Sequence, residues 1–106
     1  MTGVRRIPVM QLSELSENSN KAVAVEGSSI LVCRTEKGVF AVENMCSHMM
    51  ATLEGGRVRG VNLFCPKHGA RFDLRTGIPA ALAKTPIRTY PVTLSDEGMI
   101  EVEVSA

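Results

Sequence analysis

The sequence predicts an all-β protein, because it contains many short β-rich runs, spaces them regularly and separates them with glycine-containing turns. Short strands in this pattern favour an antiparallel sandwich or barrel. We expect an antiparallel β-sandwich that carries a small subdomain from about residue 44 to residue 76. Strands are expected at residues 4–10, 21–25, 29–35, 39–43, 57–59, 61–64, 71–73, 87–94 and 99–104.

Two of these segments carry proline, which limits where they can lie. Pro8 cannot donate a hydrogen bond to a β-ladder, so the first strand is expected at a sheet edge. Residues 78–85 are rich in alanine between two prolines, and we expect a loop there. Turns are expected at residues 26–28, 36–38 and 95–98, each of which contains glycine.

Length and composition indicate a single domain, residues 1–106, with enough hydrophobic residues (44%) to form a core. The formal net charge of +1 and the lack of a basic run argue against nucleic-acid binding. No segment approaches the length that spans a bilayer, and no apolar run follows the two arginines near the N-terminus. The cytoplasm is therefore the simplest placement, and no nucleic-acid or membrane partner is expected. We also expect a monomer.

The most informative stretch runs from Cys46 to His68. It reads Cys-Ser-His, then sixteen residues, then Cys-Pro-Lys-His, and it contains both histidines of the chain. A Cys-x-His pair and a Cys-x-x-His pair are what a Rieske [2Fe–2S] cluster needs, because histidines replace cysteines on one of its two irons. We predict that Cys46, His48, Cys65 and His68 bind one such cluster, each loop giving one thiolate and one imidazole.

Two simpler interpretations compete with this one. A structural zinc site also uses two cysteines and two histidines, but its usual spacings are C-x2–4-C and H-x3–5-H, and a Cys-x-His pair suits a zinc knuckle poorly. Alternatively, the four residues are two core cysteines and two surface histidines, which requires four metal-competent residues to fall into paired loops by chance. Both interpretations are less favoured than the cluster.

The two segments C-S-H-M-M-A-T-L-E-G-G and F-C-P-K-H-G-A-R-F-D-L-R-T-G resemble a Rieske domain. They are most similar to the small Rieske-type ferredoxins of bacterial aromatic-ring-hydroxylating dioxygenase systems, which act in aromatic hydrocarbon catabolism. The resemblance continues through residues 79–86 and 89–92, so it covers about the last two thirds of the chain. It implies the Rieske fold and identifies the small subdomain as the cluster-binding part.

The resemblance also implies a function. A ferredoxin of this kind is no enzyme but a one-electron carrier, which passes electrons from a flavin-dependent NAD(P)H reductase to a terminal oxygenase. The residues support a carrier independently, because the mononuclear iron of such an oxygenase needs two histidines and none is left over. The alternatives are a small Rieske-type subunit of a cytoplasmic nitrite reductase, a zinc-stabilised interaction module and, last, a hydrolase, for which no free histidine base remains.

Three further expectations concern single positions. Strand alternation places Cys33 on the face of Leu31, and we expect it to be a buried, inert thiol. The partner is expected to dock at the loop tips, where Met49, Met50 and Lys67 are the nearest candidates, although either methionine could pack under its loop instead. High-potential Rieske proteins add a disulfide between the loops, a serine hydroxyl directed at a sulfide and a tyrosine hydroxyl directed at a ligand thiolate. The resemblance places Ala51 and Lys67 at the positions of the disulfide, Ala70 at that of the serine and Phe72 at that of the tyrosine. The absence of these features implies a low reduction potential.

Overall fold

The computed structural model describes residues 3–47, 51–67, 70–81 and 84–105. Within these ranges the chain forms antiparallel strands and one 3-10 turn, η1 (Leu12–Glu14), and no helix there is long and apolar enough to cross a membrane. The predicted all-β class is confirmed. The strands are β1 (Val4–Gln11), β2 (Ser19–Val25), β3 (Ser28–Thr35), β4 (Gly38–Glu43), β5 (Val58–Arg59), β6 (Asn62–Phe64), β7 (Arg71–Asp73), β8 (Pro79–Ala81), β9 (Thr89–Tyr90), β10 (Val92–Leu94) and β11 (Met99–Ser105).

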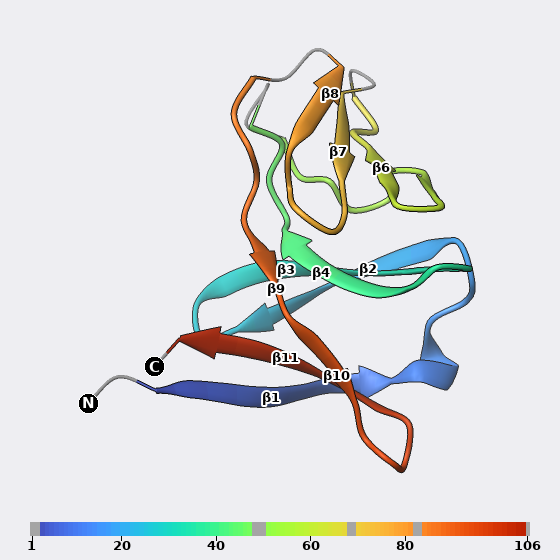
Figure 1. Cartoon of the computed structure of the whole chain (residues 1–106), viewed down its shortest axis with the longest axis vertical. Helices are drawn as coiled ribbons and strands as arrows, with labels where there is room; N and C mark the ends of the chain where they lie inside the picture. Colours follow the sequence, from blue (N-terminus) through green and yellow to red (C-terminus); the bar gives the residue numbers. More distant parts are fainter. Residues whose placement is uncertain (1–2, 48–50, 68–69, 82–83, 106) are drawn as a thin grey trace.

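The strands form three sheets that lie one above another (Figure 1). Sheet A has the order β1-β11-β10, sheet B the order β2-β3-β4-β9, and sheet C the order β5-β6-β7-β8. Sheets A and B pack face to face as the sandwich, and sheet C covers the other side of sheet B. Sheet B is therefore the middle layer.

Strand β3 shows why sheet B is buried on both sides. Its side chains alternate between the two faces. Ile30 and Val32 belong to the cores shared with sheet A, whereas Leu31 and Cys33 belong to the core shared with sheet C. All four are completely buried, so the predicted alternation about Cys33 is confirmed.

The core under sheet C is built from side chains that face one another across its strands. Val58 pairs with Leu63 and Leu63 pairs with Phe72. These three side chains are at most 2% exposed and lie in the same cluster as Val42 of β4. Complete burial of a side chain of this size stabilises the fold by about 1.5–3 kcal/mol, so sheet C is anchored firmly on sheet B.

The first strand lies at an edge, as its proline predicts. Within the described residues β1 pairs only with β11, and the register shifts between Pro8 and Met10. The shift fits a position where the ladder lacks a donor, because proline has no N–H.

One strand prediction and one loop prediction were wrong in detail. Residues 87–94 were expected to form one strand, but Pro91 separates β9, which pairs with β4 in sheet B, from β10, which pairs with β11 in sheet A. The segment crosses between the two layers at the residue that cannot donate to a ladder, while the Pro91 carbonyl still accepts from the Glu103 N–H at 2.9 Å. The expected loop at 78–85 begins with β8, which pairs with β7.

Candidate metal centre

Cys46 and Cys65 are placed at the starts of two loops of matched construction. Cys46 follows β4 by three residues, and Cys65 directly follows β6. The Cys46 N–H donates to the Ala51 carbonyl at 2.6 Å, and the Cys65 N–H donates to the Ala70 carbonyl at 2.7 Å. Each cysteine thus bonds to the residue five positions further on, so the same hydrogen bond closes the base of each loop, and the sequence of each loop contains one of the two histidines.

Both cysteines are buried in the same core. Cys46 is 0% exposed and Cys65 is 3% exposed, and both belong to the cluster that fills the space between sheets B and C. The two loop bases therefore lie against one apolar region, which shields groups bound there from water. Such shielding strengthens the electrostatic interactions of any bound ion.

The other predicted ligands, His48 and His68, lie outside the described residues, as do Met49 and Met50. Within the described ranges, no group of three or more His, Cys, Asp or Glu side chains is arranged to hold a metal ion. The expected set of four ligands therefore depends on the histidines, and it stays a prediction. Lys67, which directly precedes His68, is described and is exposed.

Asn44 fixes both ends of the first loop. Its side-chain oxygen accepts hydrogen bonds from the N–H groups of Leu53 and Glu54, both at 2.9 Å. Its side-chain nitrogen donates to the Ser29 hydroxyl at 3.1 Å, and its own N–H donates to the Ser29 carbonyl at 3.1 Å. This buried amide therefore ties the loop to β3 of the middle sheet.

Gly56 lets the turn after the first loop pack against the second loop. A Cβ atom at this position would lie 2.1 Å from the Phe64 carbonyl oxygen and 3.2 Å from Cδ of Pro66, the residues on either side of Cys65. Only glycine permits this approach. Asn20 holds the same turn, since its side chain donates to the Gly56 carbonyl at 2.8 Å and accepts from the Gly55 N–H at 2.9 Å.

Ser47, between the two predicted ligands of the first loop, contacts a distant part of the chain. Its hydroxyl donates a hydrogen bond to the Thr85 carbonyl. Thr85 belongs to the segment between β8 and β9, so this bond brings that segment to the first loop. Sequence reasoning missed Ser47, Asn44 and Gly56 as positioning residues. Their partners lie far away in the sequence. The sequence showed only the residue types, two hydrogen-bonding side chains and a glycine, and these do not identify the partners.

Cys33 differs from the two loop cysteines in its position. It lies within β3, 0% exposed, and no loop surrounds it. Burial raises the pKa of the Cys33 thiol to about 12, so it keeps its proton at neutral pH. A protonated thiol is a poor metal ligand and a poor nucleophile, which agrees with the expected inert role.

The described residues fit a cluster held by two loops. Two cysteines open two loops of matched construction, they share one buried core, and the sequence of each loop supplies one histidine. Thiolate and imidazole are the donor types that a Rieske cluster takes. The fold and these loops define a small β-protein of the iron–sulfur class.

Comparison with known proteins identifies the family. The model of the Rieske [2Fe-2S] domain matches residues 5–91, so the chain belongs to this family, whose cofactor is a Rieske-type [2Fe–2S] cluster. The ferredoxin component of the naphthalene 1,2-dioxygenase system of Pseudomonas putida is 33% identical over 94 residues, which cover 88% of this chain and 90% of the relative.

Solved structures agree. The ferredoxin of carbazole 1,9a-dioxygenase from Nocardioides aromaticivorans superposes with a TM-score of 0.85 at 35% identity, covering 92% of this chain and 95% of the other. A chain in a complex of reduced oxygenase and oxidized ferredoxin of carbazole 1,9a-dioxygenase superposes with a TM-score of 0.83 at 27% identity, covering 92% and 91%. The resemblance seen in the sequence is confirmed, and these relatives are electron-transfer components rather than catalytic subunits.

Proposed function

We propose that this chain is the one-electron carrier of a multicomponent dioxygenase system. The observation that carries the proposal is the pair of loops that begin at Cys46 and Cys65, each closed at its base by a backbone hydrogen bond, in a chain that belongs to the Rieske family. His48 and His68 would complete the ligand set, and residues 44–76 would act as the cluster-binding subdomain. When bound, a Rieske cluster takes up and releases a single electron.

The chain's own residues would hold this group rather than perform catalysis. The buried thiols of Cys46 and Cys65 would bind on the inner side, where sheets B and C exclude water. The backbone bonds at the loop bases, together with Asn44 and Gly56, would fix the distance between the loops. A rigid donor set lowers the structural change that accompanies electron transfer, which favours a carrier that is oxidised and reduced repeatedly.

The named relatives support the choice of partners. Ferredoxins of this kind are components of dioxygenase systems, and one of them is solved in complex with its oxygenase. We infer a terminal oxygenase as the electron acceptor and a flavin-dependent NAD(P)H reductase as the donor, with transient contacts to each. We further infer a cytoplasmic monomer. A subunit of a nitrite reductase is less favoured, because the naphthalene and carbazole relatives, both above 30% identity, belong to dioxygenase systems.

Metal analysis and reconstitution test the proposal. The purified protein is expected to contain two irons and two acid-labile sulfides, and to lose them when Cys46, His48, Cys65 or His68 is replaced. Cys33→Ser is the matched control and should keep the cluster. Zinc without sulfide would exclude the carrier, and copurification with a large sirohaem subunit would replace the oxygenase system with a nitrite reductase.

The second part of the test measures electron flow. The protein is mixed with a flavin-dependent reductase and a terminal oxygenase from its own gene neighbourhood, and the oxygenase Rieske centre is monitored after NADH is added. The centre should become reduced only when the chain is present with its cluster. Reduction at the same rate without the chain would contradict the carrier role.

A further inference from the structure

Charge is distributed very unevenly between the two ends of this molecule. Residues 44–88, which connect β4 to β9 and include sheet C, hold seven of the twelve Lys and Arg residues and only two of the eleven Asp and Glu residues. The rest of the chain is acidic on balance, and from residue 91 onward it contains four acidic residues and no basic one. The small net charge of +1 is therefore the sum of a positive end, which carries the candidate metal centre, and a negative remainder.

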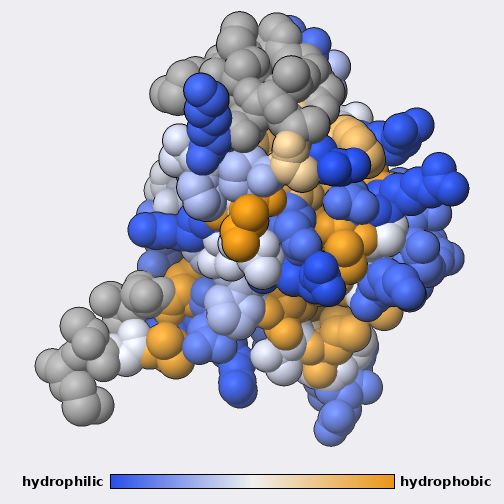
Figure 2. All heavy atoms as spheres, turned by 45° about the horizontal axis from the view of Figure 1, so that its top comes forward, coloured by the Kyte–Doolittle hydropathy of each residue, from blue (hydrophilic) through white to orange (hydrophobic). Residues whose placement is uncertain are grey.

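Several of these basic residues share the outer face of sheet C. Val58, Leu63 and Phe72 point inward, so alternation directs the neighbours of each outward. Phe64 pairs with Arg71 across β6 and β7, and the Arg57 guanidinium lies over the Phe64 ring, 5.1 Å from its centroid. We call this surface the arginine face; it consists of Arg57, Arg59, Phe64 and Arg71. In Figure 2 hydrophilic side chains project from the side on which Figure 1 places the β5–β6 hairpin.

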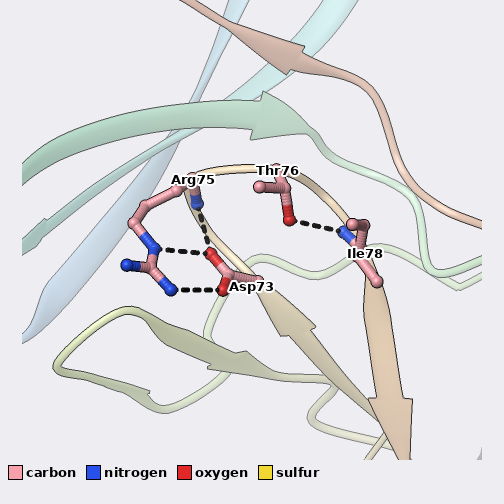
Figure 3. Close-up of polar contacts among 4 residues, drawn as sticks. All are labelled: Asp73, Arg75, Thr76 and Ile78. Carbon is pink, nitrogen blue, oxygen red and sulfur yellow. Dashed lines mark hydrogen bonds and ion pairs between the residues drawn. The ribbon is translucent and has the colours of Figure 1, made fainter.

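The arginines of this face have no acidic partner among the residues that the structure describes. The ion pairs within those residues are Arg5 with Glu26 and Arg75 with Asp73. Asp73 is the carboxylate nearest to the face in the strand register, and Arg75 occupies both of its oxygens, at 3.1 Å from Nε and 2.8 Å from Nη2 (Figure 3). Arg71 Nε is buried and lacks a hydrogen-bond partner within the described ranges. The positive charge of Arg57, Arg59 and Arg71 is thus left uncompensated there.

The arginine face also borders the candidate metal centre. Phe64 directly precedes Cys65, and Arg71 directly follows Ala70, whose carbonyl closes the second loop. A partner seated on this face would lie beside that loop. Electron transfer requires such proximity, whereas binding of a nucleic acid would not require it.

We propose that the arginine face docks a carboxylate-rich surface of a redox partner protein. The inference rests on the proposed function and adds the surface and the charge of the partner. Arginine and aromatic residues are enriched where binding energy concentrates in protein interfaces, and a guanidinium binds a carboxylate through two parallel hydrogen bonds. The acidic opposite end turns the molecule into a dipole, which would orient the positive end toward an acidic partner during approach.

A matched pair of double variants tests this face. Arg57→Glu/Arg59→Glu reverses two exposed residues of the arginine face, and Arg5→Glu/Arg6→Glu reverses two exposed residues of β1 in sheet A, so both change the net charge equally. The probe is a gold surface coated with carboxylate-terminated alkanethiols, at low ionic strength. Surface plasmon resonance measures binding, and voltammetry on the same surface measures electron transfer.

Wild type and Arg5→Glu/Arg6→Glu should bind alike and exchange electrons rapidly, whereas Arg57→Glu/Arg59→Glu should bind at least about tenfold more weakly. Arg57→Gln/Arg59→Gln, which removes charge without adding carboxylates, should fall between them; it also serves if the reversed variant fails to fold. Equal losses in both reversed variants, or no loss at the arginine face, would overturn the proposal. Tighter binding to a duplex DNA oligonucleotide at the same salt would overturn it too, in favour of a nucleic-acid surface.

The two readouts separate this inference from the proposed function. Binding to the carboxylate surface does not require the cluster, whereas the voltammetric signal does. The protein could bind normally through the arginine face and yet contain no iron and give no voltammetric signal. This result would exclude the carrier role but would still support the arginine face as a docking surface. A normal voltammetric signal that is the same in all variants would exclude the docking face and leave the carrier.

Discussion

The Ser47 hydroxyl donates a hydrogen bond to the Thr85 carbonyl, across 38 positions of sequence. Ser47 directly follows Cys46, and Thr85 belongs to the segment that leads from sheet C back to sheet B. One bond thus couples the first loop to a segment that the sequence places between two prolines. The bond would limit the access of water and chelators to the candidate metal centre.

Replacing Ser47 tests this coupling. Ser47→Ala should speed the loss of the cluster's visible absorption in the presence of a chelator by about fivefold, the equivalent of a hydrogen bond worth about 1 kcal/mol. Ser47→Thr keeps the hydroxyl and is expected to behave like the wild type. A threonine variant that loses its absorption as fast as the alanine variant would show that packing, rather than the bond to Thr85, protects the site.

The Asn44 side chain should contribute strongly to stability. Asn44→Ala leaves the N–H groups of Leu53 and Glu54 without their acceptor, and each orphaned donor costs about 1–3 kcal/mol when buried. Because the Glu54 bond is only partly buried, we expect a total loss of about 2–4 kcal/mol in the free energy of unfolding, measured by urea denaturation. Ser29→Ala removes only the bond to the side-chain nitrogen and should cost about 1 kcal/mol or less; a larger loss there than in Asn44→Ala would contradict this role.

These residues show how far the sequence alone could predict the structure. The alternation in β3 and the two cysteine loops depend on neighbours within a few positions, so patterns in the sequence revealed them. The partners of Asn44, Ser47 and Gly56 come from other strands and loops, and their identity follows only from the folded arrangement.

The same reason explains the errors and omissions. Pro91 cannot donate to a β-ladder, which the sequence shows. The change of sheet at this residue, however, depends on the pairing of β9 with β4 and of β10 with β11. The pairing of β8 with β7 overrode the proline and alanine composition of its segment. The basic residues of the arginine face are not consecutive in the sequence, so they form no basic run, and the acidic residues elsewhere in the chain bring the net charge close to zero.

Cys33 should make the stability of the protein sensitive to alkaline pH. Its thiol ionises near pH 9 in the unfolded chain, whereas burial raises the pKa to about 12 in the folded protein. Ionisation therefore favours the unfolded chain between these values: the contribution of the buried neutral thiol to stability is complete below about pH 9 and is lost as the pH rises toward 12.

Urea denaturation at pH 8 and at pH 10.5 measures this effect. Between these values the wild type should lose on the order of 2 kcal/mol more stability than Cys33→Ala, which has no thiol at that position. The comparison cancels the lysines and the tyrosine, because both proteins contain them. If the two proteins lose stability in parallel, the folded thiol already ionises near its ordinary pKa.

The reduction potential of the cluster should lie near the low end of the Rieske range, which extends from about −150 to +300 mV. The sequence resemblance implies that Ala70 and Phe72 stand where high-potential Rieske proteins have hydroxyl groups that donate to a sulfide and to a ligand thiolate. Both residues are 0% exposed and belong to the same hydrophobic core as Cys46 and Cys65. A hydroxyl at these positions would be shielded from water, where a hydrogen bond to sulfur stabilises the added electron most effectively.

Protein-film voltammetry on the wild type, Ala70→Ser and Phe72→Tyr tests this expectation. Each variant should have a higher potential than the wild type, because its hydroxyl stabilises the more negative, reduced state. Ala70→Val is the control: it adds volume without a hydroxyl, so an equal rise there would assign the effect to the exclusion of water. A wild-type potential well above about 0 mV, within the Rieske range, would show that backbone donors alone suffice for a high potential and that the absence of the two hydroxyls does not set it.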